Sequence, residues 1–345
     1  MAWAWKPYRV VGLSMEPTLV EGDWLFVQKE DPKRDDLVVF VEPGTGKYAI
    51  KRVAAVPGEA VQIVDGDLYL DGEVRQRALT SVEDLVPMLD IAGEEVDASL
   101  AFSKQGFARA GARHWKLEGT GVAFLQRPPT ADYLVHGDSI TGELPAQDLG
   151  LEVEFDLLTS DSELHLVLRK GKSTFAAVLS RSGERLQLLL QAPNQLVEEV
   201  LLEVSLPNPS TSGTAFFTLA DHAMTFVLNG KVVAADFAYP TPQPHQNSEL
   251  PVEFRKMEHA GVGGIGPLMV GRIRLGRDIL YRSSGTYGGA KAFQLAEGQY
   301  FLLGDNSPQS RDSRQYGPVP SERILGIVTS RVWPRGWTDR GWPLD

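Results

Sequence analysis

The sequence predicts a mainly β protein in which one antiparallel β domain interrupts another. Residues 8–74 hold short β-branched and aromatic runs separated by Gly and Asp, a composition typical of strands and tight turns. From residue 149 onward apolar and polar residues alternate, as in the run 151–157. Such alternation predicts strands with one buried face. Several such strands in a row indicate an antiparallel sandwich.

Length and composition narrow the class of protein. A chain of 345 residues is long enough for about two domains at roughly 150 residues each. The net charge is −11, and Lys and Arg form no block, so we expect no nucleic-acid partner. Cysteine is absent, which excludes a thiol nucleophile, a cysteine-based zinc site and any disulfide.

The elements follow in chain order. We expect strands at 24–27 and 37–40, then a hairpin of 61–64 with 68–70 about the turn Asp65-Gly66. Val82–Leu89 has a helical pattern despite Pro87, and 94–127 shows no clear period. Further strands are expected near 151–157, 164–168, 186–190 and 269–280, and Asn229-Gly230 predicts a hairpin between 226–228 and 232–233.

The strand rhythm of this middle region resembles that of jelly-roll sandwiches of the lectin and glucanase type. Residues 294–303 then return to the character of the first segment. We therefore predict a discontinuous first domain of residues 1–74 and 293–345, with a sandwich of residues 75–292 inserted at a hairpin tip, where insertions are tolerated. The carboxylates of the insertion fall mostly on the outward phase of its strands, and no metal-spaced His pair or phosphate loop occurs. We expect the sandwich to be non-catalytic.

Three short blocks stand far apart in the first domain. The first is Gly12-Leu13-Ser14-Met15-Glu16-Pro17-Thr18-Leu19, the second is Ile50-Lys51-Arg52-Val53, and the third runs from Gly304-Asp305-Asn306 to Arg314. Together they resemble the bacterial type I signal peptidases, serine proteases that use a lysine as general base. The resemblance covers residues 8–74 and 293–333.

The resemblance implies that Ser14 is the nucleophile and Lys51 its general base. A serine hydroxyl needs such a base, and no histidine is suitably placed by motif. Lys51 has apolar neighbours, and burial among them favours its neutral form. Taken singly, the serine block also fits a turn shaped by Pro17, and Lys51-Arg52 also fits a solvated strand edge.

The third block is expected to support this pair. By resemblance, Ser310 hydrogen-bonds the Lys51 amine, while Asp312 and Arg314 form an ion pair that holds the loop. The alternative for that pair is a surface salt bridge worth under about 1 kcal/mol. Asp305 fits either Arg314 or Arg52 as its partner, and the sequence leaves both open.

Substrate contacts are also implied by the resemblance. The oxyanion is expected near the Ser14 backbone N–H and Gly12, which stands where many family members carry Ser or Thr. Family members cleave after Ala-X-Ala, and the matching pocket positions are Tyr8, Val10, Met15, Leu19 and Ile50. Ordinary core packing is the other interpretation of these five residues.

We therefore expect a signal peptidase I that releases signal peptides from secretory preproteins, without metal or cofactor. Membrane lipid is a second expected partner, supported by tryptophans near both termini, although scattered surface positions or a packed tail are the preferred explanation of the three C-terminal ones. We expect the cell membrane as the location, with the catalytic domain on its outer side. No segment of this chain has the length and apolarity of a membrane span, so we expect a removed or upstream anchor and a chain that is soluble as given.

Two other functions fit part of the pattern. Self-cleaving peptidases of the LexA/UmuD type share the Ser-Met-x-Pro box and the lysine, but the third block belongs to signal peptidases. An inactive peptidase scaffold carrying a glycan- or protein-binding sandwich is the remaining possibility, although the partner of the insertion is unknown. Intact Ser14 and Lys51 argue against lost activity.

Overall fold

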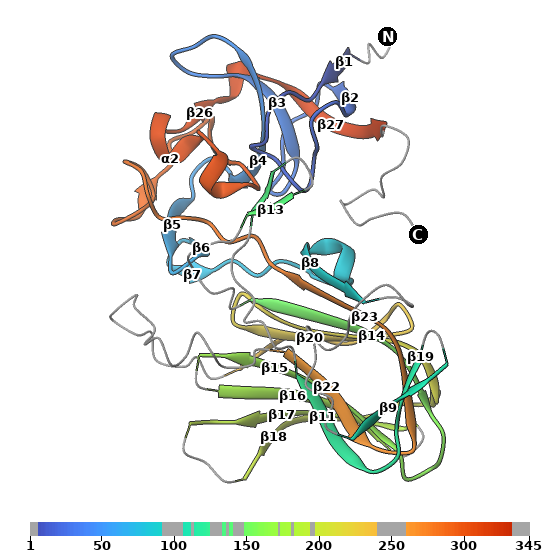
Figure 1. Ribbon diagram of the computed structural model, residues 1–345. Coiled ribbons are helices and arrows are strands. Elements are labelled where there is room, and N and C mark those ends of the chain that lie inside the picture. The colour runs from blue at the N-terminus through green and yellow to red at the C-terminus, as the bar shows by residue number, and fades with distance from the viewer. Residues whose placement is uncertain are drawn as a thin grey trace. The chain divides into compact units, whose positions relative to one another are not determined.

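The computed structural model describes residues 6–91, 106–111, 114–124, 133–135, 138–140, 148–171, 173–180, 183–193, 197–239 and 260–332. The chain is mainly β, as predicted, and it divides into two compact units (Figure 1). The first unit comprises Met1–Arg75, Asp132–Thr141 and Ile279–Asp345, and the second comprises Gln76–Ala131 and Gly142–Asp278.

The first unit is built on a seven-stranded sheet with the order β1-β2-β27-β3-β4-β25-β26 and a four-stranded sheet with the order β24-β5-β6-β7, all paired antiparallel. Its remaining elements are a two-stranded sheet and short helical turns. The bounds are β1 Lys6–Arg9, β2 Trp24–Gln28, β3 Leu37–Val41, β4 Tyr48–Ala55, β5 Ala60–Val64, β6 Asp67–Leu70, β7 Glu73–Val74, β12 Tyr133–Val135, β13 Asp138–Ile140, β24 Phe293–Gln294, β25 Gln299–Leu303, η3 Ser307–Gln309, α2 Ser313–Tyr316, β26 Val319–Pro320, η4 Ser321–Arg323 and β27 Ile324–Val332.

Alternating apolar residues place these strands over small cores. Val38 and Phe40 of β3 pack with Val53 of β4 and Leu302 of β25 in one cluster. A second cluster joins β4, β5, β6 and β25. The predicted hairpin is confirmed, because Val64 pairs with Asp67 and both turn residues, Asp65 and Gly66, have positive φ.

The second unit consists mainly of two antiparallel sheets. One has the order β21-β20-β19-β14-β23-β10-β9 with β8 also paired to β23, and the other has the order β11-β22-β15-β16-β17-β18. The bounds are η1 Val82–Asp84, β8 Val86–Ile91, β9 Phe107–Ala110, β10 His114–Leu117, β11 Thr120–Phe124, β14 Leu149–Leu157, β15 Glu163–Lys170, β16 Ser173–Ser180, β17 Arg185–Gln191, β18 Glu199–Ser205, β19 Ser212–Ala220, β20 Ala223–Leu228, β21 Lys231–Ala238, β22 Ala260–Ile265 and β23 Leu268–Arg277.

One apolar cluster lies between the two sheets, which makes the second unit a sandwich. It includes Leu151 and Val153 of β14 from the first sheet and Leu164, Leu166 and Leu168 of β15 from the second. These are the residues of the predicted inward phase, and Glu154 of the opposite phase is exposed. The Asn229-Gly230 hairpin is confirmed too, since Leu228 pairs with Lys231 across two residues with positive φ.

The helix expected over Val82–Leu89 is not formed at that length. Val82–Asp84 is a single 3₁₀ turn, and the chain then enters β8, where Leu89 pairs with Leu275 of β23. Pro87 explains the change, because proline disfavours helical conformation in the residue before it and lacks the N–H that a helix interior uses. The helical pattern was overridden by pairing with β23.

The division between the units also differs from the expected boundary at residue 292. Residues 279–292 lie in the first unit, where Tyr281 is buried and Ile279 and Tyr287 pack against the cluster around Val61. The packing of apolar side chains therefore places the return to the first unit at residue 279, a boundary that the alternation of residues in the sequence did not indicate.

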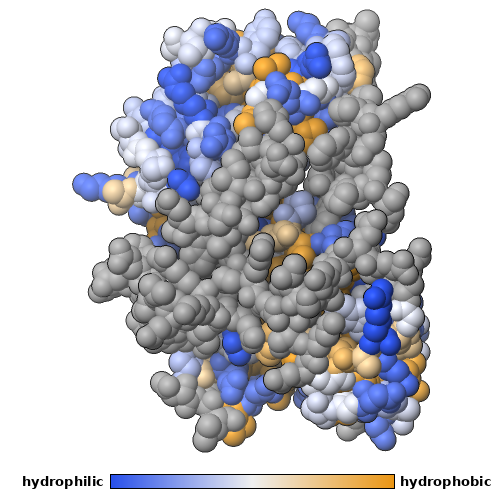
Figure 2. All heavy atoms as spheres, viewed as in Figure 1, coloured by the Kyte–Doolittle hydropathy of each residue, from blue (hydrophilic) through white to orange (hydrophobic). Residues whose placement is uncertain are grey.

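Exposed apolar side chains of the first unit include Val11, Trp24 and Tyr48. On the face seen in Figure 2, hydrophilic residues surround the apolar ones. None of the helices in the described ranges has the length and apolar character needed to cross a lipid bilayer. The tryptophans expected at a membrane surface, at positions 3, 5, 333, 337 and 342, lie outside the described residues.

Candidate active site

The serine block forms the loop between β1 and β2. Its base is closed by two backbone hydrogen bonds, from Val10 N to Asp23 O at 2.8 Å and from Gly22 N to Val10 O at 3.0 Å. Met15 and Leu19 are buried in a cluster with Val10 and Leu25. Apolar side chains on both sides of Ser14 thus anchor the loop and hold the half-buried serine at its surface.

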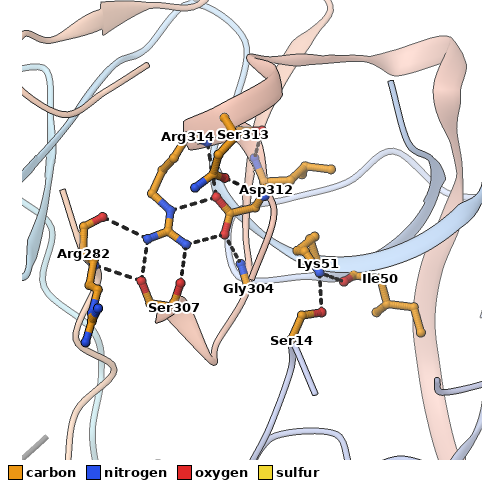
Figure 3. A network of polar contacts seen from close by, with 11 residues as sticks. Ser14, Ile50, Lys51, Arg282, Gly304, Ser307, Asp312, Ser313 and Arg314 are labelled. Carbon is orange, nitrogen blue, oxygen red and sulfur yellow. Dashed lines mark hydrogen bonds and ion pairs between the residues drawn. The ribbon is translucent and has the colours of Figure 1, made fainter. Parts of the chain in front are cut away.

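Lys51 lies in the middle of β4, where it pairs with the buried Val38 of β3. Its side chain is 3% exposed. The Nζ atom lies 2.5 Å from Ser14 Oγ and donates a hydrogen bond to Ile50 O at 2.9 Å (Figure 3). Two residues that are 37 positions apart in the sequence are therefore in direct contact.

Burial sets the proton affinity of this lysine. Loss of solvation lowers the pKa of the Lys51 amine from 10.5 to about 8, although the carboxylates of Asp312, Asp305 and Glu42 act to raise it. A substantial share of the amine is then neutral near pH 8. A neutral amine in contact with a hydroxyl can accept its proton, and this is the step that activates a serine.

Arg52 follows Lys51 and forms the ion pair that the sequence left open. Its Nε and Nη2 atoms donate to the two carboxylate oxygens of Asp305 at 2.9 and 2.5 Å, and Nη1 donates to Asp35 O at 3.0 Å. Asp305 is 5% exposed. A bidentate arginine–carboxylate pair holds both partners in one orientation, so Asp305 and β4 are joined.

Asp312 and Arg314 form the expected ion pair, and it is fully buried at 0% and 1% exposure. Nε and Nη2 of Arg314 donate to the carboxylate oxygens at 2.8 and 2.7 Å. The same carboxylate accepts from Gly304 N at 3.1 Å, and Arg314 also donates to Ser307 Oγ at 2.6 Å (Figure 3). The alternative of a surface salt bridge is therefore wrong.

The third block also contacts the serine loop directly, through a residue that sequence reasoning missed. Asn306 donates from its backbone N to Ser14 O at 3.1 Å and from Nδ2 to Leu13 O at 3.0 Å. The signal was present in the sequence as an asparagine in a tight turn, where a short amide side chain often bonds nearby backbone. Its partner, almost three hundred residues away, was not predictable locally.

Ser310 does not make the expected hydrogen bond to Lys51. Its Oγ atom is buried and has no hydrogen-bond partner among the described residues. The hydroxyl instead lies beside Gly304, where a β-carbon would stand 2.2 Å from Oγ. Ser310 therefore packs closely against the backbone of Gly304 instead of bonding to Lys51.

The predicted oxyanion and pocket residues surround the same loop. Within the described residues the backbone N–H of Ser14 makes no hydrogen bond, and Gly12 has a φ of +85°. Three pocket positions, Val10, Met15 and Leu19, share one cluster, and Ile50 packs against it. Tyr8 lies on β1, with its ring 5.9 Å from that of Tyr48. Their roles toward a substrate stay predictions.

Comparison with known proteins reaches all three segments of the first unit. A family model described as signal peptidase, peptidase S26, matches residues 1–139 and 223–333. Signal peptidase I of Bacillus licheniformis is 38% identical over 77 residues, which are 21% of this chain and 41% of that protein. Signal peptidase I of Streptococcus pneumoniae is 41% identical over 68 residues, which are 19% of this chain and 33% of that protein. The chain thus spans about two fifths or less of these curated relatives.

Solved structures are similar to this chain at a lower level. Galectin LEC-6 of Caenorhabditis elegans matches 49% of this chain and all of its own, with 11% identity and a TM-score of 0.30. The carbohydrate-binding module CBM66 of Bacillus subtilis matches 51% of this chain and 90% of its own, with 9% identity and a TM-score of 0.29. TM-scores this low do not establish a shared fold or function. The family model, in contrast, matches well over half of the residues and includes all three blocks around Ser14 and Lys51, so this chain belongs to the signal peptidase family, peptidase S26.

Proposed function

We propose that this protein is a serine endopeptidase of the signal peptidase I type, with Ser14 as nucleophile and Lys51 as general base. The observation that carries the proposal is the 2.5 Å contact between Lys51 Nζ and Ser14 Oγ at a lysine that is 3% exposed. An exposed lysine would be charged at neutral pH and unable to accept a proton. A lysine pKa of about 8 supports its use as a base.

The proposed reaction is an acyl transfer from the substrate peptide to Ser14 and then to water. Neutral Lys51 accepts the hydroxyl proton while Ser14 Oγ attacks the scissile carbonyl carbon, which forms the C–O bond and a tetrahedral oxyanion. The free N–H of Ser14 is placed to donate to that oxyanion. The lysine ammonium then returns the proton to the leaving amine as the C–N bond breaks. Water, deprotonated by Lys51, then attacks the ester carbonyl carbon, and the lysine ammonium returns the proton to Ser14 Oγ as the C–Oγ bond breaks.

The proposed substrates are secretory preproteins, cleaved after Ala-X-Ala. The cluster of Val10, Met15 and Leu19 supports a small apolar pocket next to Ser14. Within the described residues β1 pairs with β2 alone, so its other edge is open to an extended peptide. Strand addition supplies backbone hydrogen bonds while the pocket selects side chains.

The proposed location is the outer side of the cell membrane, with lipid as a second partner. Val11 is 81% exposed and Trp24 is 48% exposed, and both lie at the ends of the serine loop. Exposed apolar and indole side chains next to Arg9, which pairs with Trp24 across β1 and β2, suit a membrane–water interface. The second unit is proposed to be non-catalytic.

A serine-directed acylating probe tests the proposal. The wild-type chain should be labelled at Ser14, and Ser14→Ala and Lys51→Ala should each abolish labelling and cleavage of an Ala-X-Ala peptide. Ser283→Ala and Lys47→Ala are matched controls, because both side chains are exposed, and they should keep full activity. Full activity in Ser14→Ala or Lys51→Ala would overturn the assignment, whereas no labelling of the wild-type chain would favour an inactive scaffold.

A further inference from the structure

The connection that leads into the second unit begins at a residue with an ion pair. Arg75 is the last residue of the first unit before that connection. Its backbone N donates to Leu68 O at 2.7 Å, and its guanidinium pairs with the carboxylate of Asp35. The Arg75 side chain is 8% exposed, although Asp35 is 45% exposed. Because Arg75 has no other side-chain partner among the described residues, this buried guanidinium depends on Asp35.

Asp35 connects Arg75 to β4, the strand that contains Lys51. The φ of Asp35 is +75°, a left-handed conformation that is unfavourable for a non-glycine residue. Asp35 N donates to Val53 O at 2.9 Å, and Asp35 O accepts from Arg52 Nη1 at 3.0 Å. The side chain of Asp35 is thus bonded to Arg75, while its backbone is bonded to Arg52 and Val53 of β4.

Arg52 connects Asp35 to Asp305, which lies next to a residue that bonds the serine loop. It follows Lys51 in β4 and holds Asp305 by two hydrogen bonds. Asp305 stands between Gly304 and Asn306, and the Asn306 N–H bonds Ser14 O. A continuous series of hydrogen bonds, with one peptide bond between Asp305 and Asn306, therefore runs from Arg75 through Asp35 and Arg52 to the serine loop.

The connection that returns from the second unit meets the other ion pair. The first unit resumes at Ile279, and three residues later Arg282 O accepts from Arg314 Nη1 at 2.9 Å (Figure 3). Arg282 N donates to Ser307 Oγ at 2.8 Å. The first and the last of the crossings between the two units therefore lead to the Arg52–Asp305 and Asp312–Arg314 pairs.

We propose that Arg75 is a positioning residue, which couples the junction with the second unit to the placement of Ser14 and Lys51 through Asp35 and the Arg52–Asp305 pair. The inference rests on the proposed function for its kinetic effect, but its structural part does not. The side chain of Arg75 bonds Asp35 and neither Ser14 nor Lys51, so it acts through the residues between them.

The test uses the full chain with Arg75→Met, Asp35→Asn and the double variant. Methionine keeps an apolar stem in the buried position, and asparagine tolerates positive φ. Each single change should slow acylation of Ser14 between about 2-fold and about 30-fold, with unchanged KM for peptide. The double variant should be no slower than the slower single variant, because both remove one link. Arg75→Lys should recover part of the rate.

Arg34→Gln is the matched control. Arg34 adjoins Asp35 but pairs with Glu59, whose other hydrogen bond is to Val56 N rather than to Arg52, so acylation should be unchanged. Hydrogen exchange gives a readout that needs no activity. Arg75→Met should increase exchange in peptides covering 10–23 and 304–314 and leave β14 unchanged.

The outcomes separate the two proposals. If wild-type Ser14 is not acylated but exchange rises as expected, the proposed function fails and the positioning role stands. If Arg75→Met is folded and shows wild-type acylation and wild-type exchange, the positioning role is wrong. Multiplying effects in the double variant, or an equal loss in Arg34→Gln, would also overturn it.

Discussion

Gly304 faces Ser310 with no room for a side chain between them. A β-carbon on Gly304 would stand 2.2 Å from Ser310 Oγ and 2.5 Å from Ser14 O. Gly304→Ala must therefore displace the serine loop or the third block. Displacement of about 1 Å at a catalytic group costs about 100-fold in rate. We expect a loss of that size in peptide cleavage, measured as kcat, with the β-sheet circular dichroism spectrum retained.

Gly119→Ala is the control for this substitution. No atom lies within 4 Å of the position of its β-carbon, so activity should match that of the wild-type chain. A fully active Gly304→Ala variant would show that the contact with Ser310 does not determine the position of Ser14.

Cleavage should rise with pH as Lys51 loses its proton. Since burial lowers the pKa of Lys51 to about 8, the rate should increase through about pH 8 and then level off. Asp312, Asp305, Glu42 and Arg314 are the charged groups that act on this lysine. Glu42→Gln removes a charge that raises the pKa of Lys51, so its profile should shift to lower pH.

The pH–rate profile of Glu73→Gln provides the comparison. Glu73 is exposed and is not among the groups acting on Lys51, so its profile should coincide with that of the wild-type chain. A rate that stays constant between about pH 6 and about pH 9 would be incompatible with a lysine base of this pKa.

The same lysine should make the stability of the fold depend on pH. The amine loses its proton near pH 8 in the folded protein and near 10.5 in the unfolded chain. Between these values the unfolded chain binds the extra proton, so the free energy of unfolding rises with pH. At about 1.36 kcal/mol per pKa unit, the buried ammonium destabilises the fold below pH 8 by about 3 kcal/mol.

Lys51→Met removes that effect. Its gain in the free energy of unfolding over the wild-type chain should be largest below pH 8 and should shrink by about 3 kcal/mol toward pH 10.5, as measured by urea unfolding. The exposed Lys47→Met variant should show no such trend. An advantage of Lys51→Met that does not vary with pH would contradict burial of the charge.

Breaking the Asp312–Arg314 pair should be costly. Asp312→Ala leaves the guanidinium of Arg314 buried at 1% exposure without its carboxylate. Removing one partner of a buried pair costs about 3–5 kcal/mol in the free energy of unfolding. Glu203→Ala breaks a pair with Arg185 whose side chains are 48% and 28% exposed, and should cost under about 1 kcal/mol. Equal losses in the free energy of unfolding of the two variants would show that burial does not make the Asp312–Arg314 pair more costly to break.

Replacing the second unit should separate its role from that of the junction. A short Gly-Ser turn in place of residues 76–278 also removes β12 and β13 of the first unit, but it keeps all three blocks together with Arg75 and Ile279, so peptide cleavage should persist. Replacing residues 75–292 also removes Arg282, whose backbone bonds Arg314 and Ser307, and should abolish cleavage. If the shorter replacement is folded but inactive, the second unit or the β12–β13 sheet removed with it contributes to catalysis.

Much of this protein was predictable from the sequence because the relevant rules act over a few residues. The period-2 alternation identified the strands of the sandwich, and Asp65-Gly66 and Asn229-Gly230 identified hairpins through their positive φ. The pairing of Asp312 with Arg314 spans two residues. The order of the three blocks indicated Ser14 and Lys51, although their roles remain proposals.

Tertiary structure decided the features that depend on residues far apart. The sequence left Asp305 with two possible arginines, and the choice of Arg52 follows from the pairing of β4 with β25. Burial of Lys51 needs β3 beside β4, and the bond from Asn306 to Ser14 needs the chain to close over almost three hundred residues. Local propensity carries no information on such contacts, because they form when apolar faces pack and bring distant polar groups together.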